Sequence, residues 1–305
     1  MKGHSSGWNA SVNRTLRNCG PYLYILPAFL VFILFKGYPT IYNFYLTAFN
    51  WDGVSPTKEF VGLVNYVKMF DDYILHRALV NNGIYVGVTV VTEVGGGLAL
   101  ALLLNMGFRG SSVLRLLAFA PFMVPMVAVG ILWALILDPY VGIVNRVFET
   151  VGLAQLAKPW LGDSSTALIS ILAVSFWRFV GFNMMLFYGA LQRMPRQLYE
   201  AAYIDGASRW RCFRYITIPL LRETTTVVML YCIIGGINMF DLFWVMTQGG
   251  PAHSTEILST WAVLKAFKFF EMGYGATIVV VVLVLCMIAT IVYLGARQRK
   301  ERIEY

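Results

Sequence analysis

The chain has 305 residues, of which 58% are hydrophobic and only 13% charged, and its mean hydropathy is +0.65. Soluble globular proteins are about one quarter charged. These figures exclude a water-soluble enzyme, and they also exclude a disordered or fibrous protein. A membrane-spanning helix needs about 20 apolar residues, so the chain has room for several.

Six apolar segments indicate the fold class, an all-α integral membrane protein. We expect six transmembrane helices at about 22–48, 78–105, 112–137, 166–191, 220–246 and 274–295. They would form one membrane domain over 22–296, between an N-terminal segment, 1–21, and a basic tail, 297–305. Lys36 and Pro39 interrupt the first helix, so its outer part is expected to be kinked or partly outside the bilayer. A cleaved secretory signal is not expected, because the apolar run is too long.

The basic residues predict the orientation. With the N-terminus inside, fifteen Lys and Arg lie on the cytoplasmic side and seven on the outside, while Lys36 and Arg178 fall within spans. Cytoplasmic loops carry the excess of positive charge, so both termini are predicted to be cytoplasmic. The net charge of +8 therefore reports membrane topology, and no nucleic-acid partner is expected.

Cysteine and histidine indicate no metal or disulfide site. Cys19 and Cys212 lie in basic polar stretches, whereas Cys232 and Cys286 lie inside apolar runs. There is no Cys-x-x-Cys pair and no second histidine at metal-binding spacing. We therefore predict no metal site in this chain.

The long cytoplasmic loop 192–219 is the most informative stretch. Good helix formers precede Gly206, and a glycine can take a positive φ and end that helix. A second short helix follows, with Trp210 and Phe213 on one face and Thr217 nearby on the same face. Small residues on this projection would let another backbone approach closely. The pattern fits docking into a cleft of a partner, and equally an amphipathic helix lying on lipid headgroups.

The sequence of this loop resembles the coupling motif of the permease subunits of ABC importers. The matching residues are Glu200, Ala201, Ala202, Asp205, Gly206, Ala207 and Trp210, followed by Ile218-Pro219. The run from Thr247-Gln248-Gly249-Gly250-Pro251 to Ser254-Thr255 agrees with the carbohydrate-importer branch, as do Tyr188-Gly189-Ala190 and Gly273-Tyr274-Gly275. The resemblance spans about 24–296, and the chain is similar to the maltose-permease-like subunit of such importers.

The resemblance implies an assembly. It would contain a second homologous permease, two cytoplasmic ATPase subunits and an external solute-binding protein, all at the inner or plasma membrane of a bacterium or archaeon. The sequence has no Gly-x-x-x-x-Gly-Lys-Ser/Thr loop, so ATP and Mg²⁺ would be bound by the ATPase partner. This chain itself would be a transport subunit without cofactors and not an enzyme.

Polar residues inside spans are candidates for the substrate path, because burying them in a membrane is costly. These are Glu93, Ser175, Trp177, Arg178, Asn238 and Asp241. In the family that the chain resembles, sugar lies near 175–179 and 232–239. An interhelical ion pair of Arg178 with Glu93 or Asp241 is the structural alternative. Gly95-Gly96-Gly97 favours a close contact between helices over a ligand loop.

Three functional classes compete. The leading one is the permease of an ATP-driven importer for an oligosaccharide or related carbohydrate, with a glycerol phosphate as an alternative substrate. An integral-membrane enzyme would need clustered histidines or carboxylates near one bilayer face, and the sequence has none. An ion-driven secondary transporter would show inverted repeats or broken helices, and only Glu93 and Asp241 favour it.

Overall fold

The computed structural model describes residues 24–303, with side chains up to Arg297, so the N-terminal segment 1–21 lies outside the described residues. The described chain is helical, apart from a hairpin in which Phe49–Asn50 (β1) pairs antiparallel with Glu59–Phe60 (β2). Four helices are long and apolar enough to cross a membrane, and there are six if each of two bent pairs counts as one span. The predicted all-α membrane fold is confirmed.

The first span is one helix from Tyr24 to Leu46, and none of its most apolar part is buried. Its irregularity is a π-helical turn, Ile33–Gly37 (η1), followed by Tyr38–Leu46 (α2). Pro39 has no backbone N–H to donate, and the Thr40 hydroxyl donates to the Lys36 carbonyl at 2.7 Å. The interruption predicted at Lys36 and Pro39 therefore takes the form of a π-helical turn within a continuous helix.

The second span runs from Tyr73 to Asn105 and begins five residues earlier than predicted. Asp72 caps it, because its Oδ1 accepts a hydrogen bond from the Leu75 backbone N–H at 3.0 Å. The span consists of Tyr73–Thr89 (α4), a π-helical turn Val90–Val94 (η3) and Gly95–Asn105 (α5).

The third predicted span, 112–137, is present as a bent pair of helices. It consists of Ser111–Met123 (α6) and Met126–Ile136 (α7), which are bent by 101° relative to each other. Val124 and Pro125 between them both have extended backbones. A proline removes a helical hydrogen bond and disfavours helical angles in the preceding residue, which explains the break.

The fifth predicted span, 220–246, is also divided. A short helix, Ile218–Leu220 (α12), precedes Arg222–Ile237 (α13), and Asp241–Met246 (α14) follows as a separate helix. Gly235 and Gly236 end α13, where glycine lowers helix stability. Asn238 then has φ −89° and ψ 4°, outside the helical region.

The fourth span, Ala167–Leu191 (α9), agrees with the prediction, and the sixth, Met272–Ile303 (α16), is longer than predicted. Most of the basic tail assigned to 297–305 therefore continues the last helix. Gly97 of α5 packs on α9, because a Cβ there would lie 2.8 Å from the Asn183 Cβ. Gly96 also faces α9, through Phe176, whereas Gly95 has open space beside it. The predicted close helix contact is thus made by two of the three glycines.

Several short helices lie outside the predicted spans. They are Val64–Lys68 (α3), Met69–Asp71 (η2), Ile143–Thr150 (α8), Ala154–Leu156 (η4), Leu258–Val263 (α15) and Leu264–Lys268 (η6). The α15 helix lies between the fifth and sixth predicted spans, and its Leu258 and Trp261 side chains are buried. Asp72 accepts hydrogen bonds from the Trp261 indole at 2.8 Å and from the Tyr274 hydroxyl at 2.7 Å. This carboxylate joins α4, α15 and α16.

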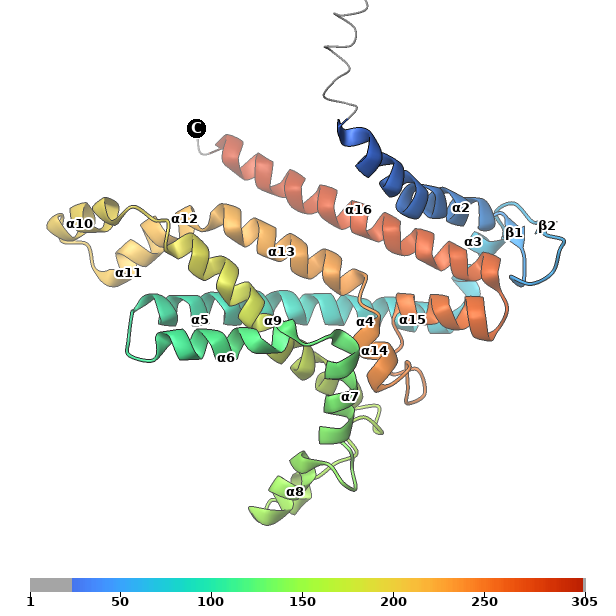
Figure 1. The fold of residues 1–305 in the computed structure, drawn as a ribbon, viewed down its shortest axis with the longest axis horizontal. Coiled ribbons are helices and arrows are strands. Elements are labelled where there is room, and N and C mark those ends of the chain that lie inside the picture. Colours follow the sequence, from blue (N-terminus) through green and yellow to red (C-terminus); the bar gives the residue numbers. More distant parts are fainter. Residues whose placement is uncertain (1–23, 304–305) are drawn as a thin grey trace, which may run out of the picture.

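Most of the loops lie at two opposite ends of the molecule, whereas α8 and the loops beside it extend away from both ends (Figure 1). The α5–α6 turn, the loop 192–219 and the C-terminal end of α16 lie at one end. The β-hairpin, α3 and α15 lie at the other. This grouping agrees with the division into predicted cytoplasmic and external loops.

Candidate functional site

The loop 192–219 forms two short helices that project from one end of the molecule (Figure 1). They are Arg196–Ile204 (α10) and Arg209–Cys212 (α11), and a π-helical turn, Phe213–Thr217 (η5), connects α11 to α12. The predicted helix–turn–helix shape of this loop is therefore present. We call residues 196–212 the projection.

Gly206 ends the first helix of the projection, with φ +76°. The Ala207 N–H donates to the Ala202 carbonyl at 2.9 Å, and the Gly206 N–H donates to the Tyr203 carbonyl at 3.1 Å. This pair of bonds is a Schellman motif, which requires a left-handed residue where glycine carries no steric penalty. The glycine therefore fixes the angle between α10 and α11.

The second helix of the projection is held by its own contacts. The Ser208 hydroxyl caps α11 by accepting from the Arg211 N–H at 3.3 Å. The Tyr199 and Thr217 hydroxyls are 2.9 Å apart and join α10 to η5. The Trp210 and Phe213 rings contact each other at a tilt of 37°, with centroids 5.4 Å apart, as their predicted common face requires. These contacts make the projection a defined structural unit.

The residues of the coupling motif lie on the outside of this unit. Glu200, Ala201, Asp205, Gly206 and Trp210 are exposed, while Ala202 and Ala207 are half-buried. Ile204 is 86% exposed and Trp210 is 69% exposed. Exposed apolar patches of this kind mark contact surfaces for a protein or a membrane. The projection thus presents a small-residue surface flanked by large apolar side chains.

Glu93 belongs to a hydrogen-bonded network between three spans. Ser175 donates to Glu93 Oε1 at 2.8 Å, and the Ser175 and Tyr85 hydroxyls are also 2.8 Å apart. The Cys232 thiol lies 3.8 Å from Glu93 Oε2. All four residues are buried, and Glu93 itself lies on the π-helical turn η3. π-turns are frequent at functional sites.

A mainly apolar cavity of about 290 Å³ lies beside this network. Tyr85, Glu93 and Cys232 form its polar wall, and Phe179 and Tyr231 contribute aromatic faces. The sequence analysis missed Tyr85 and Tyr231. The spacing Tyr85, Thr89, Glu93 is the signal that could have found this wall, because residues four apart share one helix face.

Arg178 follows Ser175 by three residues in the sequence, but its guanidinium contacts groups outside the Glu93 network. Its Nη1 donates to the Pro121 carbonyl, and its guanidinium lies 5.2 Å from the Phe122 ring centroid and 5.7 Å from that of Phe179. Among the described residues, Arg178 makes no ion pair with Glu93 or Asp241. The ion-pair alternative is therefore wrong, and Arg178 holds the carbonyl next to the α6–α7 bend.

The other predicted path residues lie apart from this cavity. Trp177 packs edge-on against Trp133 of α7, with ring centroids 5.4 Å apart. Asn238, just after α13, lines a second cavity of about 330 Å³ between α2, α15, η6 and α16. Its Nδ2 donates to the Cys286 sulfur at 3.1 Å. Asp241 is exposed in the first turn of α14. The six residues therefore do not form one cluster.

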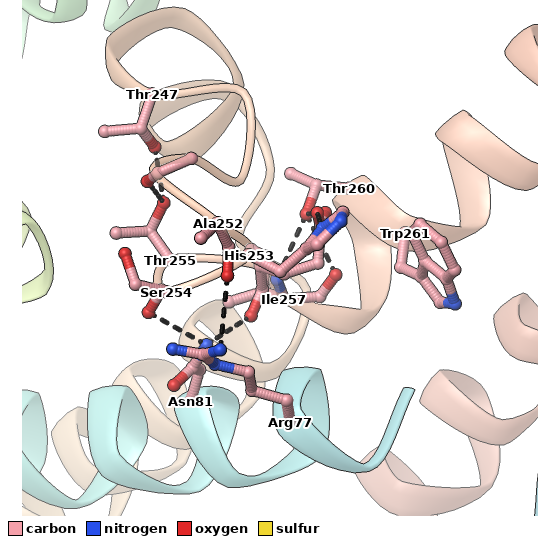
Figure 2. Close-up of polar contacts among 12 residues, drawn as sticks. Arg77, Asn81, Thr247, Ala252, His253, Ser254, Thr255, Ile257, Thr260 and Trp261 are labelled. Atoms are coloured by element: carbon pink, nitrogen blue, oxygen red, sulfur yellow. Dashed lines mark hydrogen bonds and ion pairs between the residues drawn. The ribbon is translucent and has the colours of Figure 1, made fainter. Parts of the chain in front are cut away.

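The motif after the fifth span forms a tightly bonded external loop (Figure 2). Glu256 is fully buried there and accepts from the Thr260 hydroxyl at 2.6 Å, with His253 Nδ1 2.8 Å from its other oxygen. Asn81 of α4 donates to the Ser254 and Glu256 carbonyls at 3.1 and 2.8 Å. A Cβ at Gly249 would overlap the Glu256 carboxylate, which explains the glycine in this motif. The loop is thereby fixed to α4.

Comparison with known proteins identifies the family to which this fold belongs. Residues 94–301 match the family described as the binding-protein-dependent transport system inner membrane component. The chain is 38% identical over 269 residues to the probable ABC transporter permease YurN of Bacillus subtilis, covering 88% of this chain and 92% of that protein.

Two further relatives carry more specific names. The diacetylchitobiose uptake system permease NgcF of Streptomyces coelicolor is 34% identical, covering 88% of this chain and 79% of that one. The sulfoquinovosyl glycerol permease SmoG of Agrobacterium fabrum is 32% identical, with 92% and 90% covered.

A solved bacterial ABC transporter involved in import of the acidic polysaccharide alginate shares the fold. Its TM-score is 0.83 at 19% identity, over 95% of this chain and 99% of that one. The chain thus belongs to the family of binding-protein-dependent transport system inner membrane components, as a multi-pass permease subunit of an ABC transporter.

Proposed function

We infer that the chain is a permease subunit of an ATP-driven importer that moves an oligosaccharide or related carbohydrate across a bacterial or archaeal inner membrane. Two relatives are named for a chitobiose derivative and a sulfoquinovosyl glycerol, which supports a carbohydrate substrate. The importer function is supported most directly by the projection, because its Gly206 turn and exposed Trp210 match the coupling motif.

In this proposal the projection docks on an ATPase subunit. A second homologous permease completes the pathway, and an external solute-binding protein delivers the sugar. A solved alginate transporter with a similar fold is described in complex with a periplasmic protein. ATP and Mg²⁺ bind to the two ATPase subunits, and this chain needs no cofactor and carries out no chemistry of its own. Lipid surrounds the exposed apolar faces of its spans.

The substrate path is proposed to pass the polar residues of the second, fourth and fifth spans. Glu93 lines one cavity, with Ser175 hydrogen-bonded to it, and Asn238 lines another. Trp177 and Arg178 lie on α9, and Asp241 begins α14. Aromatic faces and hydrogen-bonding groups at these cavities suit the C–H surfaces and hydroxyls of a sugar.

The test is co-purification followed by reconstitution. Tagged chain expressed with its sister permease, ATPase and binding protein is expected to retain the ATPase and to take up carbohydrate with ATP inside the vesicles. Uptake that persists without ATP but stops when the ion gradient collapses would instead support a secondary transporter.

A further inference from the structure

The helix α8 carries an apolar stripe that nothing in the described chain covers. Ile143, Val147 and Val151 follow one another at four-residue spacing and therefore lie on one face. Their exposed fractions are 63%, 52% and 67%. Arg146 and Glu149, which are also exposed, lie on the other side of the helix. A helix divided in this way is typical of a boundary between water and an apolar phase.

The rotation of α8 is fixed by its other contacts. Asn145 is buried, and its side chain accepts from the Trp160 indole N–H at 2.7 Å and donates to the Lys158 carbonyl at 3.0 Å. Val144 and Phe148 face inward onto a mainly apolar cavity of about 280 Å³. The stripe cannot turn inward without breaking these contacts, so its exposure is a property of the fold.

The cavity relates α8 to the depth of the bilayer, because its opposite wall belongs to the first turns of α9, from Ile169 to Val174. The 25 residues of α9 make a helix about 37 Å long, slightly more than the hydrocarbon core of about 30 Å. The far end of α9 leads into the projection, on the predicted cytoplasmic side, so its first turns lie at the outer boundary. α8 lies at that boundary too. Figure 1 agrees, since α7 and α8 extend sideways from the long helices and not beyond either end.

Three further features indicate lipid as the neighbour of the stripe. Trp133 and Trp160 line the same cavity, and tryptophan gathers at membrane–water interfaces. The rim of the cavity continues the exposed apolar surface of a span, because Ile169 is 65% exposed and Phe176, two turns further along α9, is also exposed. The branched side chains of the stripe also suit acyl chains better than a close contact between helices, for which small residues are enriched in membranes.

We propose that α8 is an interfacial helix whose stripe binds the acyl chains of outer-leaflet phospholipid, with Arg146 and Glu149 at the level of the headgroups. The helix thereby anchors α7, which follows the bend at Val124-Pro125, to the outer surface of the bilayer. The proposal rests on the membrane fold and is independent of the transported substrate.

Nitroxide labels on α8 test this proposal in the full complex, reconstituted in phospholipid nanodiscs. The partner subunits would carry no reactive cysteine, and serine would replace the native cysteines of this chain, which are Cys19, Cys212, Cys232 and Cys286. Single labels at Val147→Cys and at the matched control Glu149→Cys would then be compared by electron paramagnetic resonance. Dissolved oxygen collides mainly with labels in lipid, whereas a water-soluble nickel chelate collides with labels in water.

We expect the label at 147 to collide severalfold more with oxygen than with the nickel chelate, and the label at 149 to show the reverse order. Adding the binding protein should change neither result. Nickel access at 147 equal to that at 149 would place the stripe in water and overturn the proposal. A label at 147 that neither reagent reaches, or that the binding protein shields, would also overturn it, because a protein would then cover the stripe. These outcomes do not depend on uptake, so a failure of the proposed transport function would leave them unchanged.

Discussion

Replacing Gly206 by valine separates the coupling function of the projection from the insertion of the spans. The residue has φ +76°, and a Cβ added there would have no neighbour within 4 Å in the described chain. The cost within this chain is therefore backbone strain alone, about 1–2 kcal/mol for an L-residue in the left-handed region. That energy changes the population of the Schellman turn by a factor of about 5–30. The membrane spans should still insert, because insertion depends on their hydrophobicity.

Two control variants separate the backbone strain at residue 206 from the loss of space for a docked partner. Gly206→Asn relieves most of the strain, since asparagine tolerates this conformation, but it still fills space that a docked partner would need. Gly152→Val imposes the same strain in an external loop, where φ is +81° and the space is also open. We expect both Gly206 variants to lose coupling and Gly152→Val to keep it.

The assay is ATP hydrolysis stimulated by the binding protein, and sugar uptake, in reconstituted complexes, with retention of the ATPase checked by size-exclusion chromatography. The expected result for Gly206→Val is loss of stimulation or of the ATPase, while the two permeases stay paired. Full stimulation and normal uptake in Gly206→Val would refute the coupling role and return the projection to the lipid-surface interpretation.

Other variants test neighbouring parts of the account. Glu200→Lys reverses an exposed charge on the projection, so stimulated ATP hydrolysis should fall. The fall should be smaller than in Gly206→Val, because exposed charges contribute little. If Glu200→Lys and Glu200→Gln hydrolyse ATP equally, docking at this face is contradicted. Trp177→Ala and Asn238→Ala should each reduce uptake severalfold without changing basal ATP hydrolysis, because a single neutral hydrogen bond or ring contact contributes about 0.5–1.5 kcal/mol. Normal uptake in both variants would show that neither residue lies on the substrate path. Asp72→Asn should lower the free energy of unfolding in detergent by about 1–3 kcal/mol, because hydrogen bonds to a charged acceptor are lost; an unchanged melting temperature would contradict this. Burial raises the pKa of Asp72, but hydrogen bonds from Trp261, Tyr274 and the Leu75 backbone lower the pKa more, so it lies below its usual range. This stabilisation should be complete well above the pKa of an unfolded aspartate, about 3.9, and it should be lost as the pH falls through the lowered pKa.

The sequence was sufficient for the long uniform helices and for the projection. α9 lies within one residue of its predicted start, because its apolar run contains no proline and Arg178 is its one charged residue. The turn at Gly206 was predictable because a glycine after a run of helix formers permits only a few helix endings. Spans interrupted by local chemistry were less predictable. Hydropathy over a window of about 19 residues does not register Val124-Pro125, and this pair bends the third span by 101°.

The polar residues of the spans were found as single residues but not as sites. Charge left open an ion pair of Arg178 with Glu93 or Asp241, whereas Glu93 accepts from a hydroxyl and Arg178 donates to a backbone carbonyl. Such partners come from other helices, and their identity depends on helix rotation, which a hydropathy pattern does not specify. Tyr85 shares a face with Glu93 and was missed because tyrosine blends into an apolar span. The buried α15 was missed because its six residues are too few to register as a span.

One measurement tests the central claim, that this chain couples ATP hydrolysis to carbohydrate uptake through the projection. Purified permease pair and ATPase, reconstituted in vesicles with ATP inside and the binding protein outside, would be given radiolabelled oligosaccharide with and without an ionophore. The account predicts uptake that requires ATP and the binding protein, survives the ionophore, and disappears in Gly206→Val. Uptake that the ionophore abolishes, or that Gly206→Val leaves intact, would contradict it.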